Sequence, residues 1–203
     1  MYIMRADEPG IAVRAAEVLR SGGVVLFPTD TLYCLGADAL SDAAVEVVRA
    51  IKGRDTKKPI HALVSGAEMA GEYGMLTETA AVLLAKAPLG KVSLVVDKRP
   101  GFETGIMRGL DTFGFRIPDH PLCLGMLEAF GSPITATSAN VSNRGVPTQG
   151  LGAILAQLGP AVSLIDLAID GGPSVQALPS TVIDARSAEL RIVRPGAVDI
   201  GTI

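Results

Sequence analysis

The sequence predicts an α/β fold built as a single domain over residues 1–203. Three observations support this prediction. Hydrophobic residues make up 48% of the chain, so 203 residues can bury a sizeable core. Short apolar runs recur between Gly, Pro and polar residues, which is typical of buried strands. Segments with helical periodicity alternate with these runs, as they do in α/β domains.

The predicted helices are marked by the residues at their ends. Ser41 or Asp42 can cap the second helix, and Thr77 can cap the third. Gly53 follows the second helix and is the residue type that most often ends one. The expected helices cover residues 10–21, 41–53, 77–88, 121–130 and 150–158.

The predicted strands are short and nearly all apolar. They read VVLF (24–27), IHALVS (60–65), VSLVV (92–96), FGFRI (113–117), PITAT (133–137), VSLIDL (162–167), STVID (180–184) and LRIV (190–193). Their alternation with the helices completes the α/β prediction.

Composition excludes several classes of protein. The net charge is −3, so no general affinity for nucleic acid is expected, although a local basic site can still exist. Aromatic residues make up 4% and Trp is absent, which disfavours a base-stacking surface. Cys34 and Cys123 form neither a disulfide framework nor a metal-binding spacing. The chain has no apolar run long enough for a membrane span and no apolar signal core, so we expect a cytoplasmic protein.

Common catalytic motifs are also missing from the sequence. His61 and His120 are the only histidines, and there is no GxSxG, phosphate-binding GxxxxGK[ST] or GxGxxG motif. An enzyme with this sequence would therefore position its substrates and stabilise charge, and would form no covalent intermediate with the protein.

Polar residues gather at four places along the predicted elements. Thr29–Thr31 follow the first buried strand, where a surface turn and a ligand site are both compatible with the sequence. Residues 49–58 hold five basic side chains and one acid, which indicates either a solvated helix end or an anion site. Ser138 and Asn140 can point the same way, or can satisfy a turn. Arg116 interrupts an apolar strand, so an internal salt bridge or a ligand contact must stabilise it.

Five motifs together resemble the YrdC-like family. They are GGVVLFPTDTLYCLGAD, KGRDTKKP, FRIPDHP, TATSANVS and STVIDARSAELRIVRPG, in that order, over about residues 10–198. The paired signature of the family is KxR with SxN, which here is Lys52-Gly53-Arg54 with Ser138-Ala139-Asn140. The resemblance implies a twisted mixed sheet with helices around an open, positively lined cavity, in the short single-domain form.

The resemblance also implies an activity. Members of the family join L-threonine, bicarbonate or CO2 and ATP, with Mg²⁺, into threonylcarbamoyl-AMP and release pyrophosphate. A separate transferase complex then modifies tRNA. The alternative is a non-catalytic nucleotide- or RNA-binding relative, and the synthase reading itself allows weak RNA binding. A related carbamoyl-adenylate domain of hydrogenase maturation factors normally lies within a much longer chain.

Roles for individual residues follow from the same resemblance. Thr31, Arg116 and Ser180 would bind threonine. Lys52 and Arg54 would be the catalytic residues that hold the phosphates of ATP. The complete expected nucleotide set is Lys52, Arg54, Lys58, Thr112, Ser138, Asn140, Thr148 and Arg194, and no metal ligand is expected from the protein.

The chain departs from the family pattern at three places. Cys34 replaces a usual Gly, and Leu63 replaces a common substrate-contacting His. LGKVS replaces PGPLT, which keeps Gly90 and Ser93 but loses both prolines. These differences are compatible with a divergent paralogue, whereas the retained SAN element favours the synthase.

Overall fold

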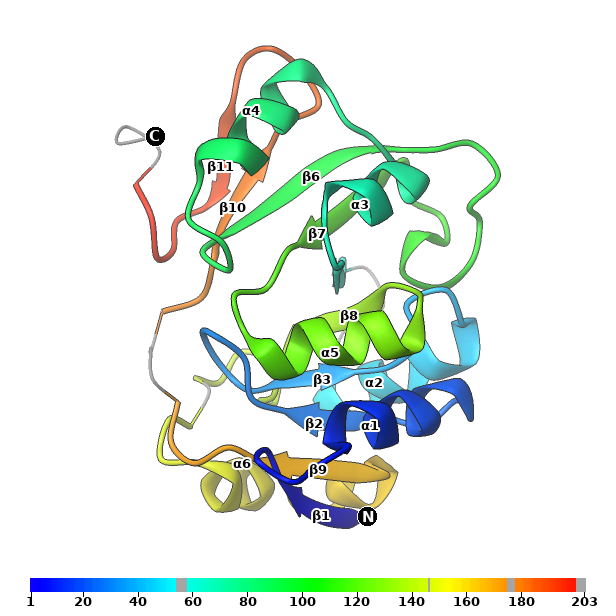
Figure 1. The fold of residues 1–203 in the computed structure, drawn as a ribbon, viewed down its shortest axis with the longest axis vertical. Coiled ribbons are helices and arrows are strands. Elements are labelled where there is room, and N and C mark those ends of the chain that lie inside the picture. Colours follow the sequence, from blue (N-terminus) through cyan, green and yellow to red (C-terminus); the bar gives the residue numbers. More distant parts are fainter. Residues whose placement is uncertain (54–57, 146, 175–177, 200–203) are drawn as a thin grey trace.

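The protein folds around one twisted, mixed β-sheet with helices on both faces (Figure 1). The computed structural model describes residues 1–53, 58–145, 147–174 and 178–199. Its strands are β1 (Tyr2–Arg5), β2 (Val25–Phe27), β3 (Cys34–Gly36), β4 (His61–Leu63), β5 (Gly74–Met75), β6 (Val92–Lys98), β7 (Thr112–Arg116), β8 (Ile134–Ser138), β9 (Leu167–Asp170), β10 (Thr181–Asp184) and β11 (Arg191–Arg194). The α-helices are α1 (Ile11–Arg20), α2 (Asp42–Lys52), α3 (Ala67–Tyr73), α4 (Glu78–Lys86), α5 (Pro121–Phe130) and α6 (Leu151–Leu158), with 3₁₀ turns η1 (Gly105–Met107) and η2 (Gly159–Leu164).

The strand order mixes parallel and antiparallel neighbours. Across the sheet it runs β1-β9-β2-β3-β8-β4-β7-β6-β10-β11, and β5 pairs with β6. β2 and β9 are parallel, whereas β3 and β8 are antiparallel. The centre of the sheet therefore brings together strands that lie far apart in the sequence, and this arrangement builds the cavity described below.

The predicted helix caps are confirmed. The Ser41 hydroxyl accepts a hydrogen bond from the Ala44 amide at 3.3 Å, and Gly53 ends α2 at φ 54°. The Thr77 hydroxyl caps α4 by accepting the Ala80 amide at 3.0 Å. Local chemistry is sufficient to set these ends, because each cap satisfies backbone groups within its own turn.

One predicted strand is wrong in its position. The VSLIDL segment, residues 162–167, begins as the 3₁₀ turn η2, and strand β9 starts only at Leu167. Pro160 stands at the start of this turn, which follows directly on α6. The Asp166 carboxylate accepts the Val24 amide at 2.8 Å and so fixes where pairing with β2 begins. Strands β1, β3 and β5 and helix α3 were not predicted, because they are short or carry a weak pattern.

Two groups of buried side chains pack against opposite faces of the sheet. One face packs mainly against α2, α4 and α6, and its core includes Phe113 and Phe115, whose rings stack with centroids 5.5 Å apart. The other face packs against α1 and α5, which lie side by side (Figure 1). No helix of the described residues is long and apolar enough to cross a membrane.

Helices α1 and α5 cover only part of their face of the sheet. Cross-strand partners lie on the same face, and Cys34 is paired with Ser138 while Leu63 is paired with Arg116. Cys34 and Leu63 pack in the core under α1 and α5, and Ser138 and Arg116 line a cavity that Cys34 also reaches. The cavity is therefore the uncovered continuation of a core-facing sheet surface.

Candidate functional site

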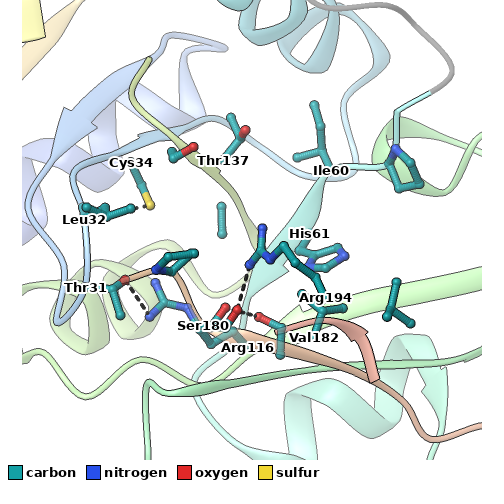
Figure 2. Close-up of a pocket in the computed structure, with 16 residues that line it drawn as sticks. Thr31, Leu32, Cys34, Ile60, His61, Arg116, Thr137, Ser180, Val182 and Arg194 are labelled. Atoms are coloured by element: carbon teal, nitrogen blue, oxygen red, sulfur yellow. Dashed lines mark hydrogen bonds between the residues drawn. The ribbon is translucent and has the colours of Figure 1, made fainter. Parts of the chain in front are cut away.

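A cavity of about 300 Å³ opens over β3, β8, β4, β7, β6 and β10. Figure 2 shows polar side chains pointing into it from strands on both sides. The residues that line it are Thr31, Leu32, Cys34, Pro59, Ile60, His61, Ser93, Arg116, Ala136, Thr137, Ser138, Pro179, Ser180, Val182, Val193 and Arg194. The structure thus gathers the predicted residues Thr31, Arg116, Ser138, Ser180 and Arg194 in one place.

Arg116 lies at the inner end of the cavity and is almost completely buried. Its Nη1 atom donates to both carboxylate oxygens of Asp30 at 3.0 Å, and to the backbone oxygen of Gly90 at 2.8 Å. The hydroxyl of Thr31 is 3.3 Å from the same nitrogen. The sequence left open whether Arg116 is paired internally or faces a ligand, and the structure shows it both paired and lining the cavity.

Asp30 is held in a pocket that its neighbours shape closely. The backbone amide of Asp119 donates to its Oδ1 at 3.3 Å, and Lys91 Nζ lies 3.9 Å from its Oδ2. Gly90 has φ +75°, and a Cβ atom there would come within 2.1 Å of Asp30 Oδ2. A side chain at position 90 would therefore be strained and would also displace the carboxylate.

The outer part of the cavity carries hydroxyl groups and a second arginine. The hydroxyls of Ser93 and Ser180 lie 2.8 Å apart, and both residues are buried. Arg194, on β11, donates from Nη2 to the backbone oxygen of Ser180 at 2.8 Å (Figure 2). Partial removal from water lowers the pKa of Arg194, and the charge of Arg116 lowers it further. Two guanidinium groups thus face one cavity, which favours an anionic ligand.

Lys52 lies beneath the rim of the cavity and contacts the SAN element. Its Nζ atom donates to the backbone oxygen of Ser138, to the backbone oxygen of Asn140 at 3.1 Å, and to Asn140 Oδ1 at 2.9 Å. The Ser138 hydroxyl donates to Asn140 Oδ1 at 2.7 Å, so these two side chains do point toward each other. Lys52 therefore joins the end of α2 to the end of β8, and the lining of the cavity contains Ser138 but not Lys52.

A neighbouring cavity of about 240 Å³ contains Thr112, another of the residues expected to contact ATP. Five residues line both cavities: Pro59, Ile60, His61, Val182 and Val193. His61 lies against Gly114, where a Cβ atom would come within 2.5 Å of the imidazole. Gly114 thus permits the ring to lie close to the sheet between the two cavities.

Lys58 and Thr148, two other predicted residues, lie apart from the lining. Lys58 is exposed, and its Nζ donates to Asn143 Oδ1 at 3.1 Å. Thr148 is half-buried, and its backbone oxygen accepts the Ser174 amide at 3.0 Å. Arg54 falls outside the described residues. The roles of all three stay predictions.

Several residues in or beside the cavity were not proposed from the sequence. Asp30, which lies behind the lining, holds Arg116, and its position between two threonines after a buried strand was the signal for it. His61 shares a strand face with Leu63, because side chains two residues apart point the same way. A histidine two residues before Leu63 therefore lines the cavity. Cys34 lines the cavity, and burial raises the pKa of its thiol.

This cavity can be compared with known proteins. The family model described as telomere recombination (Sua5/YciO/YrdC) matches residues 17–196, which covers strands β2 to β11 and every described lining residue. The chain belongs to the Sua5/YciO/YrdC family.

Relatives in this family are similar over most of the chain. A threonylcarbamoyl-AMP synthase of Bacillus subtilis is 32% identical over 96% of this chain and 56% of the relative. The mouse threonylcarbamoyl-AMP synthase is 35% identical over 91% of this chain and 67% of the relative. The crystal structure of P. abyssi Sua5 with L-threonine has a TM-score of 0.89 and 30% identity, over 100% of this chain and 59% of that one. The chain thus spans little more than half the length of two of these Sua5/YciO/YrdC proteins.

Proposed function

We propose that this protein is an L-threonylcarbamoyladenylate synthase, a nucleotidyltransferase that makes threonylcarbamoyl-AMP and pyrophosphate from L-threonine, bicarbonate or CO2, and ATP. The observation that carries the proposal is the cavity in which Arg116 and Arg194 face the same space, with the hydroxyls of Thr31, Ser93 and Ser180 around them. A carboxylate and a polyphosphate are the anions that such a pair can hold side by side.

The threonine is proposed to lie at the inner end of the cavity. Arg116 is the cation available there for its carboxylate, and the Thr31 and Ser180 hydroxyls can bind its polar atoms. Threonine as the amino-acid substrate is supported by P. abyssi Sua5, which was solved as a complex with L-threonine. Arg194 and Ser138, at the outer side, are left for the nucleotide.

The chemistry proposed for this site needs no nucleophile from the protein. The amine of threonine attacks the carbon of CO2 and loses a proton, which gives a carbamate. A carbamate oxygen then forms a bond to the α-phosphorus of ATP, and the bond to pyrophosphate breaks. Arg194, Lys52 and Arg54 are proposed to hold the two anions together and to stabilise the phosphate charge.

Mg²⁺ is proposed to enter with the nucleotide. In the described residues no group of three or more His, Cys, Asp or Glu side chains could hold a metal ion. Mg²⁺ in nucleotide sites commonly binds to substrate phosphates, waters and one or two carboxylates, and needs no larger cluster of protein ligands. An ion carried mainly by ATP is therefore compatible with this cavity. It would neutralise phosphate charge as pyrophosphate leaves.

The product is proposed to pass to a tRNA-modifying transferase complex in the cytoplasm. Weak binding to RNA would accompany that transfer. The alternative, a relative that binds nucleotide or RNA without turnover, would use the Arg194 side of the cavity but has no need for the buried Arg116 and Ser180 together.

A turnover assay separates the two functions. The protein is incubated with ATP, Mg²⁺, radiolabelled bicarbonate and each amino acid in turn, and both pyrophosphate and labelled nucleotide are measured. We expect release that requires threonine and bicarbonate together. Release from ATP alone, or no release with all substrates present, would contradict the synthase assignment.

A further inference from the structure

We propose that Asp30 is a positioning residue that orients Arg116 for the carboxylate of the amino-acid substrate. This inference rests on the proposed function, because it assigns the substrate carboxylate to Arg116. Asp30 lies outside the cavity lining, so it would act only through the guanidinium that it holds.

The contacts of Arg116 are distributed unevenly over its guanidinium group. Nη1 contacts the Asp30 carboxylate, the Gly90 backbone oxygen and the Thr31 hydroxyl. The contact of Nη2 is longer, at 3.5 Å to the Thr29 hydroxyl. Asp30 thus binds the guanidinium at one nitrogen, which leaves donors on the other side to face a ligand.

Two physical effects of Asp30 on the site can be separated. Its charge opposes that of Arg116, and this charge alone would weaken the attraction of the cavity for a second carboxylate. Its geometry fixes the plane of the guanidinium, and a planar fork binds a carboxylate well only in one orientation. If orientation dominates, disturbing Asp30 weakens threonine binding even where the positive charge of the site is unchanged.

The surroundings of Asp30 favour a fixed geometry. Only 5% of its side chain is exposed, the Asp119 amide donates to it, and Gly90 lies against it with no room for a Cβ atom. A carboxylate that only supplied charge would not need such close contacts, because Coulomb energy changes slowly with position.

Two variants test orientation against charge. Gly90→Ala keeps the Asp30 charge but pushes the carboxylate aside, since the new Cβ would lie 2.1 Å from Oδ2. Asp30→Asn removes the charge but keeps the shape and one acceptor oxygen. Asp119→Asn is the matched control, because it removes a nearby exposed charge and leaves the backbone amide that donates to Asp30 in place.

The readout is calorimetric titration of each variant with L-threonine and with L-threoninamide, which lacks the carboxylate. We expect Gly90→Ala to weaken threonine binding by about tenfold or more, as the loss of a charged hydrogen bond does. Binding of threoninamide and ATP should change little, so discrimination between acid and amide should fall. Asp30→Asn should weaken threonine binding much less than Gly90→Ala does. Asp119→Asn should bind threonine as the wild type does.

Failure of this inference is distinguishable from failure of the proposed function. If the wild type binds no threonine, the proposed function is wrong. If the wild type binds threonine and folded Gly90→Ala keeps the same preference for acid over amide, the positioning role of Asp30 is wrong. If Gly90→Ala does not fold, Asp30→Ser takes its place. Asp30→Ser shortens the side chain beyond reach of Arg116. If Asp30→Ser prefers threonine over threoninamide as strongly as Asp30→Asn does, the proposal is overturned.

Discussion

Lys52 and Asn140 are joined by two hydrogen bonds, with Nζ 2.9 Å from Oδ1 and 3.1 Å from the backbone oxygen of Asn140. The lysine is 3% exposed, although it lies in a segment rich in basic residues. The KxR and SxN elements of this chain are therefore in direct contact. Lys52 contacts Ser138, which lines the cavity, and Asn140, and does not itself belong to the lining. Its contact with phosphate stays a prediction.

Replacement of Lys52 by Met is expected to destabilise the protein and loosen the SAN element. Hydrogen bonds to a charged group contribute about 1.5–3 kcal/mol each, so the free energy of unfolding should fall by about 2 kcal/mol. ATP binding should weaken as well. Lys58→Met is the control, because Lys58 is exposed and should matter by less than about 1 kcal/mol. Chemical denaturation of both variants provides the measurement, and equal losses would contradict the contact.

Replacement of Arg116 by Ala is expected to lower both stability and threonine binding. The Asp30 carboxylate would lose Arg116 and be left with the Lys91 ammonium 3.9 Å away, and breaking a buried pair costs about 3–5 kcal/mol. Adding Asp30→Asn to Arg116→Ala should restore part of this loss, because the second change removes the buried charge. A double-mutant cycle of unfolding free energies measures the coupling, which should exceed about 1 kcal/mol. Additive effects would show that the pair contributes nothing beyond its separate members.

Replacement of Arg194 by Ala should weaken ATP binding by about tenfold and leave folding almost unchanged. Arg194 is exposed at the cavity, and its loss removes the hydrogen bond to the Ser180 backbone oxygen, which water in the open cavity can replace. The binding should also become less sensitive to salt, because one charge of the anion site is gone. Arg14→Ala on α1 makes the same change of net charge away from the cavity. A similar loss in that control would mean that net charge, and not the site, determines nucleotide affinity.

Replacement of Asp184 by Asn should destabilise the protein at neutral pH and have no effect in strong acid. Hydrogen bonds from Arg186, supported by Arg191, hold the pKa of Asp184 well below its ordinary value of 3.8. A depressed pKa in the folded state gives stability that is fully present above the unfolded pKa and is lost progressively as the pH falls from there through the folded pKa. Both arginines are exposed, so we expect about 1 kcal/mol at pH 7. Urea denaturation from pH 7 down to pH 2 should show the two proteins converge, and a constant difference would rule out titration of Asp184 as the cause.

The sequence by itself determined the elements that depend on near neighbours. The cap of α2 at Ser41 and its end at Gly53 follow from backbone groups one turn away, and the same is true of Thr77 at α4. The shift of β9 to Leu167 was missed because its start depends on Asp166 reaching Val24, a residue distant in the chain. Apolar pattern alone cannot show where such a pairing begins.

The cavity was decided only by the tertiary structure. The resemblance of five motifs pointed to Thr31, Arg116 and Ser180, but it could not show that Arg116 is already paired with Asp30, 86 residues away in sequence. It also could not show that Ser93 on β6 meets Ser180, the residue before the parallel strand β10. These contacts depend on strand order and register, which place residues from distant segments on one uncovered sheet face. The physical reason is that a local pattern fixes which face a side chain takes, whereas only the assembled sheet fixes what it meets there.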